Sequence, residues 1–204
     1  YPGNNSWGTI PDMPEDRLAP GAAALNGKIY VLGGRDGSAL KSCVVYDPLY
    51  SNWTAIAPML DARSGPGAAA LNGKIYVLGG YLGDGEDGTG HPLKSCAVYY
   101  PGNNSWSAIA DMPDARVGMG AVALNGKIYA LGGSDGSYLK SSIVFDPLAN
   151  AWSAIADMPG ARYSMGAAAL NGKIYVAGGF VGGPLKSGAV YDPATDSWSA
   201  TASM

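Results

Sequence analysis

The chain has 204 residues and a formal net charge of −3, with 47% hydrophobic and 14% charged residues. Its eight lysines recur in only two contexts, Asn-Gly-Lys and Leu-Lys-Ser, so positive charge is not gathered as a nucleic-acid surface requires. No apolar run approaches the ~20 residues of a membrane-spanning helix. We therefore expect neither nucleic-acid nor membrane partners. The 31 glycines, 14 prolines, 13 tyrosines and five tryptophans indicate short strands and tight turns rather than disorder.

The chain begins with a segment that repeats a later one. Residues 1–7, YPGNNSW, recur letter for letter at 100–106, where an outer strand is expected. We therefore predict an extra outer strand within residues 1–16.

Residues 17–57 form the first complete repeat, in which four short apolar runs are separated by turn signals. Asn26-Gly27 predicts a two-residue hairpin, because a type I′ turn needs positive φ at both positions. The Gly33–Gly34 pair permits close backbone approach, and Asp47-Pro48 is a turn signal. The predicted strands, called a to d, are residues near 19–25, Lys28–Leu32, Ser42–Tyr46 and a segment that carries Trp53 and Ile56.

Three further repeats follow at about 63–110, 116–156 and 162–202. The tryptophans at positions 7, 53, 106, 152 and 198 are spaced by 46, 53, 46 and 46 residues. An insertion after Gly80 explains the longer interval, because the segment before the repeated Leu-Lys-Ser serine has 14 residues there (81–94) and seven in the first repeat (35–41).

The insertion holds the acidic residues Asp84, Glu86 and Asp87 between glycines, and it also holds the only histidine, His91. Carboxylates in such a loop could offer oxygen ligands to Ca²⁺, but their spacing is not that of an EF-hand. We interpret the segment as a solvated acidic loop without a metal, and His91 as a surface residue.

The glycine pair after an apolar strand, the Tyr-Asp-Pro turn and the tryptophan six or seven residues past the tyrosine resemble the kelch repeat. The resemblance covers essentially the whole chain. It implies an all-β fold, with residues 1–204 as one kelch-type β-propeller domain of four-stranded antiparallel blades and four repeats per chain. Strand a is almost wholly Gly and Ala, which suits a crowded inner rim, and the tryptophan of strand d adds bulk at the wide outer edge.

The number of strands does not decide how the ring closes. Strands a, b and c occur four times but the tryptophan strand occurs five times, so a closed ring would offer two d strands to the last blade. The chain could close alone with four blades, pair with a second copy as a homodimer that forms an eight-bladed ring, or be a piece of a longer array. Near-identical repeats also fit a recently amplified or engineered sequence.

The loops divide between two faces, because the strands alternate in direction. The d–a and b–c loops share one face, and the a–b and c–d turns share the other. The a–b turns are identical in all repeats whereas the b–c loops vary, and variable loops on a constant scaffold commonly carry binding. Arginine and aromatic residues are also frequent in binding hot spots. The candidate binding residues are Arg35, Tyr81, Ser134 and Phe180 after the glycine pairs, Leu18, Ser64, Val117 and Tyr163 after a repeated arginine, and Tyr138, which replaces Ala39.

An arginine precedes strand a in every repeat: Arg17, Arg63, Arg116 and Arg162. These residues could form a ring of cations that grips an acidic peptide through bidentate hydrogen bonds. Alternatively, each ties down its own Asp-Met-Pro turn through backbone carbonyls or aspartate. We favour the structural interpretation, because framework contacts repeat from blade to blade, and we keep the arginines as secondary binding candidates.

Catalysis is not expected from this sequence. A single histidine cannot supply the several metal ligands of a galactose-oxidase-like site, nor a well-supported Ser-His-Asp arrangement. We predict no enzyme activity, no catalytic residues, no metal site and no cofactor. Cys43 and Cys96 occupy equivalent repeat positions, which are usually too distant for a disulfide, so we predict two buried free thiols. Free thiols favour a reducing compartment such as the cytoplasm.

These observations favour a rigid, non-catalytic scaffold that presents the d–a and b–c loops to a peptide or protein partner. The alternative is a self-assembling structural repeat protein, a natural fragment or an engineered one, without a specific ligand. An enzyme or sugar-binding domain is the least favoured hypothesis. Fold alone does not assign function, so the ligand is not identified by sequence.

Overall fold

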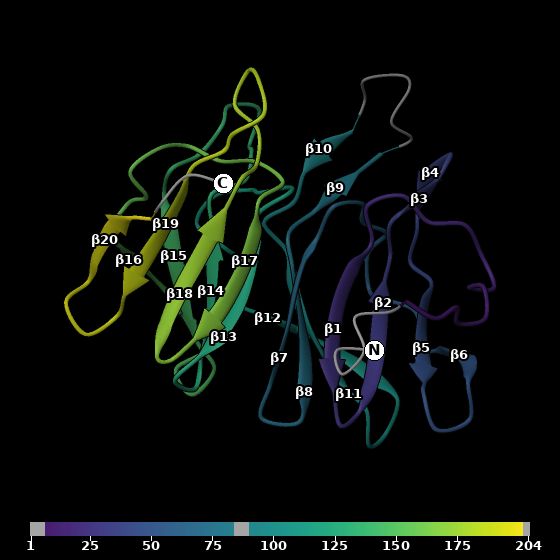
Figure 1. The fold of residues 1–204 in the computed structure, drawn as a ribbon. Helices are drawn as coiled ribbons and strands as arrows, with labels where there is room; N and C mark the ends of the chain where they lie inside the picture. The colour runs from purple at the N-terminus through teal and green to yellow at the C-terminus, as the bar shows by residue number, and fades with distance from the viewer. Residues whose placement is uncertain (1–6, 84–89, 202–204) are drawn as a thin grey trace.

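The computed structural model describes residues 7–83 and 90–201, and all regular structure in them is β-strand (Figure 1). Four antiparallel sheets of four strands follow one another along the chain as the blades of a propeller. The described residues contain no helix long and apolar enough to cross a membrane. The predicted all-β fold with four-stranded antiparallel blades is confirmed.

Each blade is a meander whose strands a to d pair in chain order. Blade 1 comprises β1 (Gly21–Leu25), β2 (Lys28–Leu32), β5 (Cys43–Asp47) and β6 (Asn52–Ile56); blade 2 comprises β7 (Gly67–Leu71), β8 (Lys74–Leu78), β11 (Cys96–Tyr100) and β12 (Ser105–Ile109). Blade 3 comprises β13 (Gly120–Leu124), β14 (Lys127–Leu131), β15 (Ser142–Asp146) and β16 (Ala151–Ile155); blade 4 comprises β17 (Gly166–Leu170), β18 (Lys173–Ala177), β19 (Gly188–Asp192) and β20 (Ser197–Ala200). Two b–c loops hold short hairpins, β3 (Arg35–Asp36) with β4 (Ser38–Ala39) and β9 (Tyr81–Leu82) with β10 (His91–Pro92).

The a–b hairpins form as the Asn-Gly signal predicts, since both residues of all four turns have positive φ. The lysine after each turn reaches toward the end of strand c. In blade 1, Lys28 forms an ion pair with Asp47 at 2.8 Å. In blade 2, Tyr100 stands at the aspartate position, and Lys74 lies 4.9 Å from the centroid of its ring. These lysines belong to the framework.

The hydrophobic core lies between blades. At the first interface, Tyr30 and Leu32 of blade 1 share a buried cluster with Ile75 and Tyr99 of blade 2. At all three interfaces the strand-b tyrosine lies 6.0–6.1 Å, centroid to centroid, from the strand-c aromatic ring of the next blade. That strand-c ring in turn packs 5.0–5.2 Å from the tryptophan of its own blade. A blade therefore needs a neighbour on each flank to bury its apolar residues.

The four blades form an arc with two free flanks. The inner strands pack in the order β1, β7, β13 and β17, and β17 makes no comparable contact with β1 among the described residues (Figure 1). The side of blade 4 that would face a following blade is consequently exposed. Tyr175 on it is 37% exposed, whereas the equivalent tyrosines of the other blades are 4–6% exposed (Tyr30, Tyr76, Tyr129). The single chain thus does not close into a four-bladed ring.

The extra outer strand predicted within residues 1–16 is not formed in its described part, residues 7–16, and residues 1–6 lie outside the described range. Strand d of each blade pairs with strand c, and no strand c of the arc is free to pair with Trp7, which is 100% exposed. The segment instead lies on blade 1, where the Trp53 indole N–H donates to the Pro11 carbonyl oxygen at 2.8 Å. At the other interfaces the tryptophan N–H donates to the residue that follows strand d of the preceding blade (Ala57, Ala110, Ala156), so Pro11 takes the place of that residue.

Candidate binding site on the loop face

The loop face is built from one backbone motif that repeats in each blade. The residue after the repeated arginine and the residue after the glycine pair exchange two backbone hydrogen bonds. In blade 2, Ser64 and Tyr81 form these bonds at 3.0 and 2.7 Å. The same reciprocal bonds join Leu18 with Arg35, Val117 with Ser134, and Tyr163 with Phe180. A constant backbone therefore holds the two variable positions of each blade side by side.

A chain of backbone hydrogen bonds links the blades at the centre of this face. The N–H of Gly65 donates to the Ala19 carbonyl (2.8 Å), that of Gly118 to Gly65 (2.9 Å), and that of Ser164 to Gly118 (2.8 Å). All four residues are left-handed, with φ of 50–61°. Glycine is required at position 118, because a Cβ there would collide with the ring of Tyr163. The Tyr163 ring, at a variable position, therefore limits which residue the central hydrogen-bonded chain can hold at position 118.

The four repeated arginines lie beneath this face and are committed to the framework. Arg63, which is 1% exposed, donates to the carbonyl oxygens of Gly79 (2.6 Å) and Ser95 (2.8 Å) and to the Ser95 hydroxyl (3.0 Å). The same pair of carbonyls, from the first glycine of the pair and from the Leu-Lys-Ser serine, is bound in the other blades by Arg17, Arg116 and Arg162.

Each later arginine also joins two blades. The Arg63 N–H donates to Leu40 (3.1 Å) and its carbonyl accepts from Gly34 (3.0 Å), both in blade 1, while its guanidinium binds blade 2. Burial lowers the pKa of the Arg63, Arg116 and Arg162 side chains. The terminal Nη groups already donate to the framework, and the Nε groups, which have no hydrogen-bond partner, are buried. No arginine donor is therefore presented to an acidic peptide, which favours the structural interpretation. The main partners, however, are the glycine pair and the serine, and the arginine's own turn contributes only Asp61 for Arg63 (3.2 Å) and Glu15 for Arg17 (2.9 Å).

The loop face is hollowed into a cavity of about 560 Å³. Residues of all four blades line it, and they include eight of the nine candidate binding residues that the sequence singled out: Leu18, Arg35, Ser64, Tyr81, Val117, Ser134, Tyr138 and Tyr163. The ninth position, Phe180, is not part of the lining and packs against Tyr138 beside it. The candidate residues, which differ between otherwise near-identical repeats, thus lie around one cavity.

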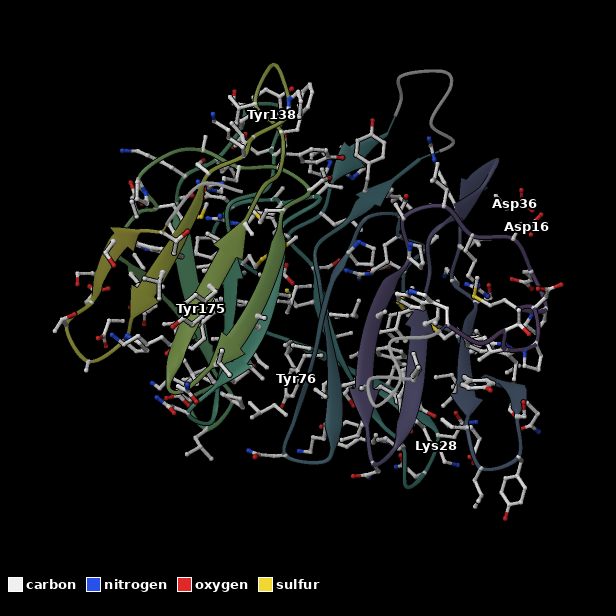
Figure 2. The ribbon with its side chains drawn as sticks, viewed as in Figure 1. Asp16, Lys28, Asp36, Tyr76, Tyr138 and Tyr175 are labelled. Atoms are coloured by element: carbon white, nitrogen blue, oxygen red, sulfur yellow. The ribbon has the colours of Figure 1, made fainter. Side chains whose placement is uncertain are left out.

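Three aromatic side chains of blades 3 and 4 form one side of this site. The ring centroid of Tyr138, which lies at the top of Figure 2, is 5.9 Å from that of Phe180 and 6.3 Å from that of Tyr163. Tyr138 and Phe180 remain 42% and 40% exposed. Across the cavity, the Tyr81 hydroxyl donates to the Gly90 carbonyl (2.7 Å), which fixes its ring. Apolar surface is therefore available to a ligand.

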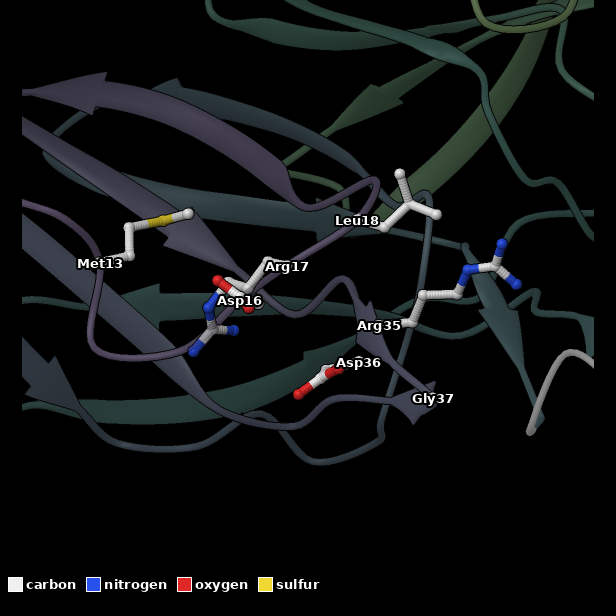
Figure 3. A pocket seen from close by; sticks show the side chains of 7 residues that line it. All are labelled: Met13, Asp16, Arg17, Leu18, Arg35, Asp36 and Gly37. Atoms are coloured by element: carbon white, nitrogen blue, oxygen red, sulfur yellow. The ribbon is translucent and has the colours of Figure 1, made fainter.

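Arg35 is the only cationic residue in the cavity lining. Its guanidinium has no hydrogen bond or ion pair within the part of the chain that the structure describes. Arg35 also borders a second hollow of about 710 Å³, which Asp16 and Asp36 line as well. Figure 3 shows that the guanidinium points away from both carboxylates. Arg35 is thus free to bind an anion.

The described residues hold no group of three or more His, Cys, Asp or Glu side chains that could bind a metal. Their one histidine, His91, is exposed, and the acidic loop residues lie outside the described range (Asp84, Glu86, Asp87). Cys43 and Cys96 are free and buried, as predicted, and burial raises the pKa of each thiol to about 11. Such thiols are protonated at neutral pH and are poor nucleophiles.

Sequence reasoning did not foresee the central hydrogen-bonded chain. Its signal was the small residue that stands two positions before the first glycine of strand a in every repeat: Ala19, Gly65, Gly118 and Ser164. Glycine at two of these positions pointed to left-handed backbone, and the other two copies obscured the pattern.

Four meander blades with the glycine pair, the buried arginine and the stacked aromatic residues define a kelch-type β-propeller. A sequence profile described as the KLHDC2/KLHL20/DRC7 Kelch-repeats domain matches residues 21–204. The chain belongs to the kelch-repeat family.

Individual relatives are matched over single repeats. Kelch-like protein 8 of Mus musculus is 38% identical over 53 residues, which cover 26% of this chain and 8% of that protein. Kelch repeat and BTB domain-containing protein 7 of Homo sapiens is 50% identical over 44 residues, which cover 22% of this chain and 6% of that protein. The matches thus span less than a tenth of these relatives. The structure of YjhT has the same fold, with a TM-score of 0.81 at 20% identity over 96% of this chain and 68% of that one.

Proposed function

We propose that the chain is a non-catalytic binding scaffold whose loop-face cavity takes up an extended segment of a peptide or protein partner. The observation that carries this function is the convergence of the variable positions of all four blades on one cavity. The repeated arginines and glycine pairs recur without change, whereas the cavity lining differs from blade to blade. Membership of the kelch-repeat family supports an interaction role.

The chemistry of the cavity indicates what such a segment would carry. Tyr138, Tyr163 and Phe180 offer aromatic surface to an apolar side chain. Arg35, whose guanidinium has no partner among the described residues, can bind a carboxylate through two parallel hydrogen bonds. Ser64 and Ser134 add hydroxyl groups that can bind a peptide backbone. A volume of about 560 Å³ is within the usual range of ligand sites.

The test begins with a random peptide library displayed on phage and selected on the immobilised chain. The affinity of a selected peptide is then measured by fluorescence anisotropy. Tyr138→Ala is expected to weaken binding about tenfold or more, as for an aromatic hot spot. Arg35→Ala should weaken a carboxylate-bearing peptide similarly and leave its amide analogue unchanged.

The matched control is Tyr50→Ala. Tyr50 is also an exposed aromatic residue, at 72%, but it lies in the c–d turn of blade 1, on the opposite face. Its replacement should not change the affinity. If peptides bind Tyr138→Ala and Arg35→Ala as tightly as the original chain and lose affinity for Tyr50→Ala, the cavity is not the site.

A further inference from the structure

We propose that the free flank of blade 4 is a docking surface for blade 1 of a second copy of this chain. This contact uses residues apart from the loop-face cavity. The chain makes the same blade-to-blade contact at three internal interfaces. Blade 4 carries one side of this contact without a neighbour, and blade 1 carries the other side without a neighbour.

Each internal interface joins the leaving flank of one blade, which faces the following blade, to the arriving flank of the next. At the first interface Tyr30 lies 6.0 Å from Tyr99, in one buried cluster with Ile75. At the outer edge, Trp106 donates its indole N–H to the Ala57 carbonyl oxygen at 2.8 Å. The ring pair and the tryptophan bond recur at the other two interfaces.

Blade 4 has the same leaving flank without a neighbour. Tyr175 is 37% exposed and Leu170 59% exposed (Figure 2 labels Tyr175 on β18). Ala168 and Ala177 are exposed as well, whereas their equivalents in blade 2 are buried (Ala69, Leu78). A contiguous apolar flank of this kind is covered at every internal interface, and its exposure marks a site of interaction.

Blade 1 has the complementary arriving flank. Ile29 is 40% exposed, while its equivalents on the arriving flanks of blades 2 to 4 are fully buried (Ile75, Ile128, Ile174). Ala22 and Ala24 of β1 are exposed beside it. None of these positions is charged on either flank, so joining the flanks buries no unpaired charge.

The central hydrogen-bonded chain ends at the same two blades. Ala19 accepts from Gly65 through its carbonyl, and Ser164 donates its N–H to Gly118. The Ala19 N–H and the Ser164 carbonyl have no partner within the described residues. Docking in the internal geometry places the Ala19 N–H of the second copy against the Ser164 carbonyl of the first. A donor at one end and an acceptor at the other give the polarity of a head-to-tail contact.

Residues 7–16 of the second copy approach β20 of the first copy at this contact. They lie on blade 1 through the bond from Trp53 to Pro11, at the place where strand d of a preceding blade ends. In the repeat alignment, Trp7 of the second copy corresponds to Trp198 of β20 in the first, so the two segments compete for the strand-d position beside β19. Ile10 matches the last strand-d residue of blades 1 to 3 (Ile56, Ile109, Ile155), whereas blade 4 has Thr201 there.

A second copy is the occupant that fits, because its blade 1 reproduces the arriving flank of every internal interface. The contact should nevertheless be weaker than an internal one. Ala177 stands where the other blades have a fully buried leucine (Leu32, Leu78, Leu131), which leaves unfilled space at the seam. We therefore expect association that depends on concentration, and we expect Ala177→Leu to strengthen it.

Sedimentation velocity of the 204-residue chain, over about a hundredfold range of concentration, measures this association. The average mass should rise with concentration above the 20.8 kDa of one chain. Tyr175→Asp on blade 4 and Ile29→Asp on blade 1 should each weaken the association about tenfold or more, since each buries a charge at the seam. Leu170→Lys and Ala24→Asp are second variants for the two sides. Tyr138→Ala, in the cavity, should associate normally.

A mixture of Tyr175→Asp with Ile29→Asp gives the sharpest result. Each variant alone lacks one flank, but the mixture contains one intact blade 4 flank and one intact blade 1 flank, so a head-to-tail contact predicts a one-to-one dimer. A chain that stays at 20.8 kDa at every concentration overturns the inference. Variants that associate as the original chain does, or a mixture that stays monomeric, also overturn it. Peptide binding at the cavity is independent of all these outcomes.

Discussion

Arg63 and Ser64 are neighbours in sequence and belong to two different parts of the molecule. Arg63 is 1% exposed, binds two blades and has an identical counterpart in every repeat. Ser64 lines the loop-face cavity, and its counterparts are Leu18, Val117 and Tyr163. A residue that donates hydrogen bonds to buried carbonyl oxygens cannot be replaced without leaving them unpaired, whereas a residue that only lines the cavity can be replaced. In this chain, the repeated arginines mark contacts between blades, and the variable residues that follow them and the glycine pairs mark the candidate binding surface.

The largest effect is expected when a framework arginine is replaced. Arg116 is 0% exposed and donates to the carbonyls of Gly132 (3.1 Å) and Ser141 (2.8 Å). Arg116→Ala leaves the buried Gly132 carbonyl without a donor and the Ser141 carbonyl with only the Gly132 N–H (3.1 Å), and it should lower the free energy of unfolding by about 3–5 kcal/mol, measured by urea denaturation. The matched control is Arg35→Ala, for which a change within about 0.5 kcal/mol is expected. Equal losses for the two variants would contradict the division between framework and surface.

The second effect concerns a position that varies and is nevertheless buried, occupied by Cys43, Cys96, Ser142 and Gly188 in the four blades. Burial raises the thiol pKa from 9.0 to about 11, so the neutral thiol is favoured in the folded state. Between these values the unfolded chain loses protons first, and stability falls as pH rises from about 9 to 11.

The loss should be about 2 kcal/mol for each thiol at pH 11. Urea unfolding at pH 8 and pH 11 measures it, and the double variant Cys43→Ser, Cys96→Ser is the control, since Ser142 already occupies this site in blade 3. The variant should lose less stability over this interval. An identical loss in both proteins would show that other groups cause the alkaline destabilisation.

The third effect joins the two regions. A Cβ on Gly118, whose φ is +61°, would collide with the Tyr163 ring at the cavity. Gly118→Ala should therefore cost about 1–3 kcal/mol of stability. Tyr163→Ala in the same chain removes the collision but keeps the left-handed backbone, so it should recover part of the loss. A double-mutant cycle from urea unfolding measures that coupling, and strictly additive losses would mean that the ring does not require the glycine.

Much of the fold followed from sequence because its signals are local and occur four times. The Asn-Gly hairpins and the order of the strands in each blade act over short distances, and each copy supports the others. Variation within the frame also singled out the cavity residues, since a two-residue backbone bridge fixes where they point.

The open arc and the outcome for residues 1–16 could not be read in the same way. Whether strand d finds a strand c depends on the curvature of the whole array, which no single repeat encodes. The arginine contacts were also only partly foreseen, because Arg63 reaches Gly79 and Ser95, respectively 16 and 32 residues away. Such contacts join segments that only the folded blade brings together.

The most direct test of the division between frame and binding surface is an NMR titration of the isotopically labelled chain with a library-selected peptide. The shifts are predicted to concentrate at Ser64, Tyr81, Ser134, Tyr138 and Tyr163, with Trp53 and the Asn-Gly turns of the opposite face unchanged. Shifts centred on those turns or on the outer strands, with the cavity residues silent, would contradict the assignment of binding to the loop face.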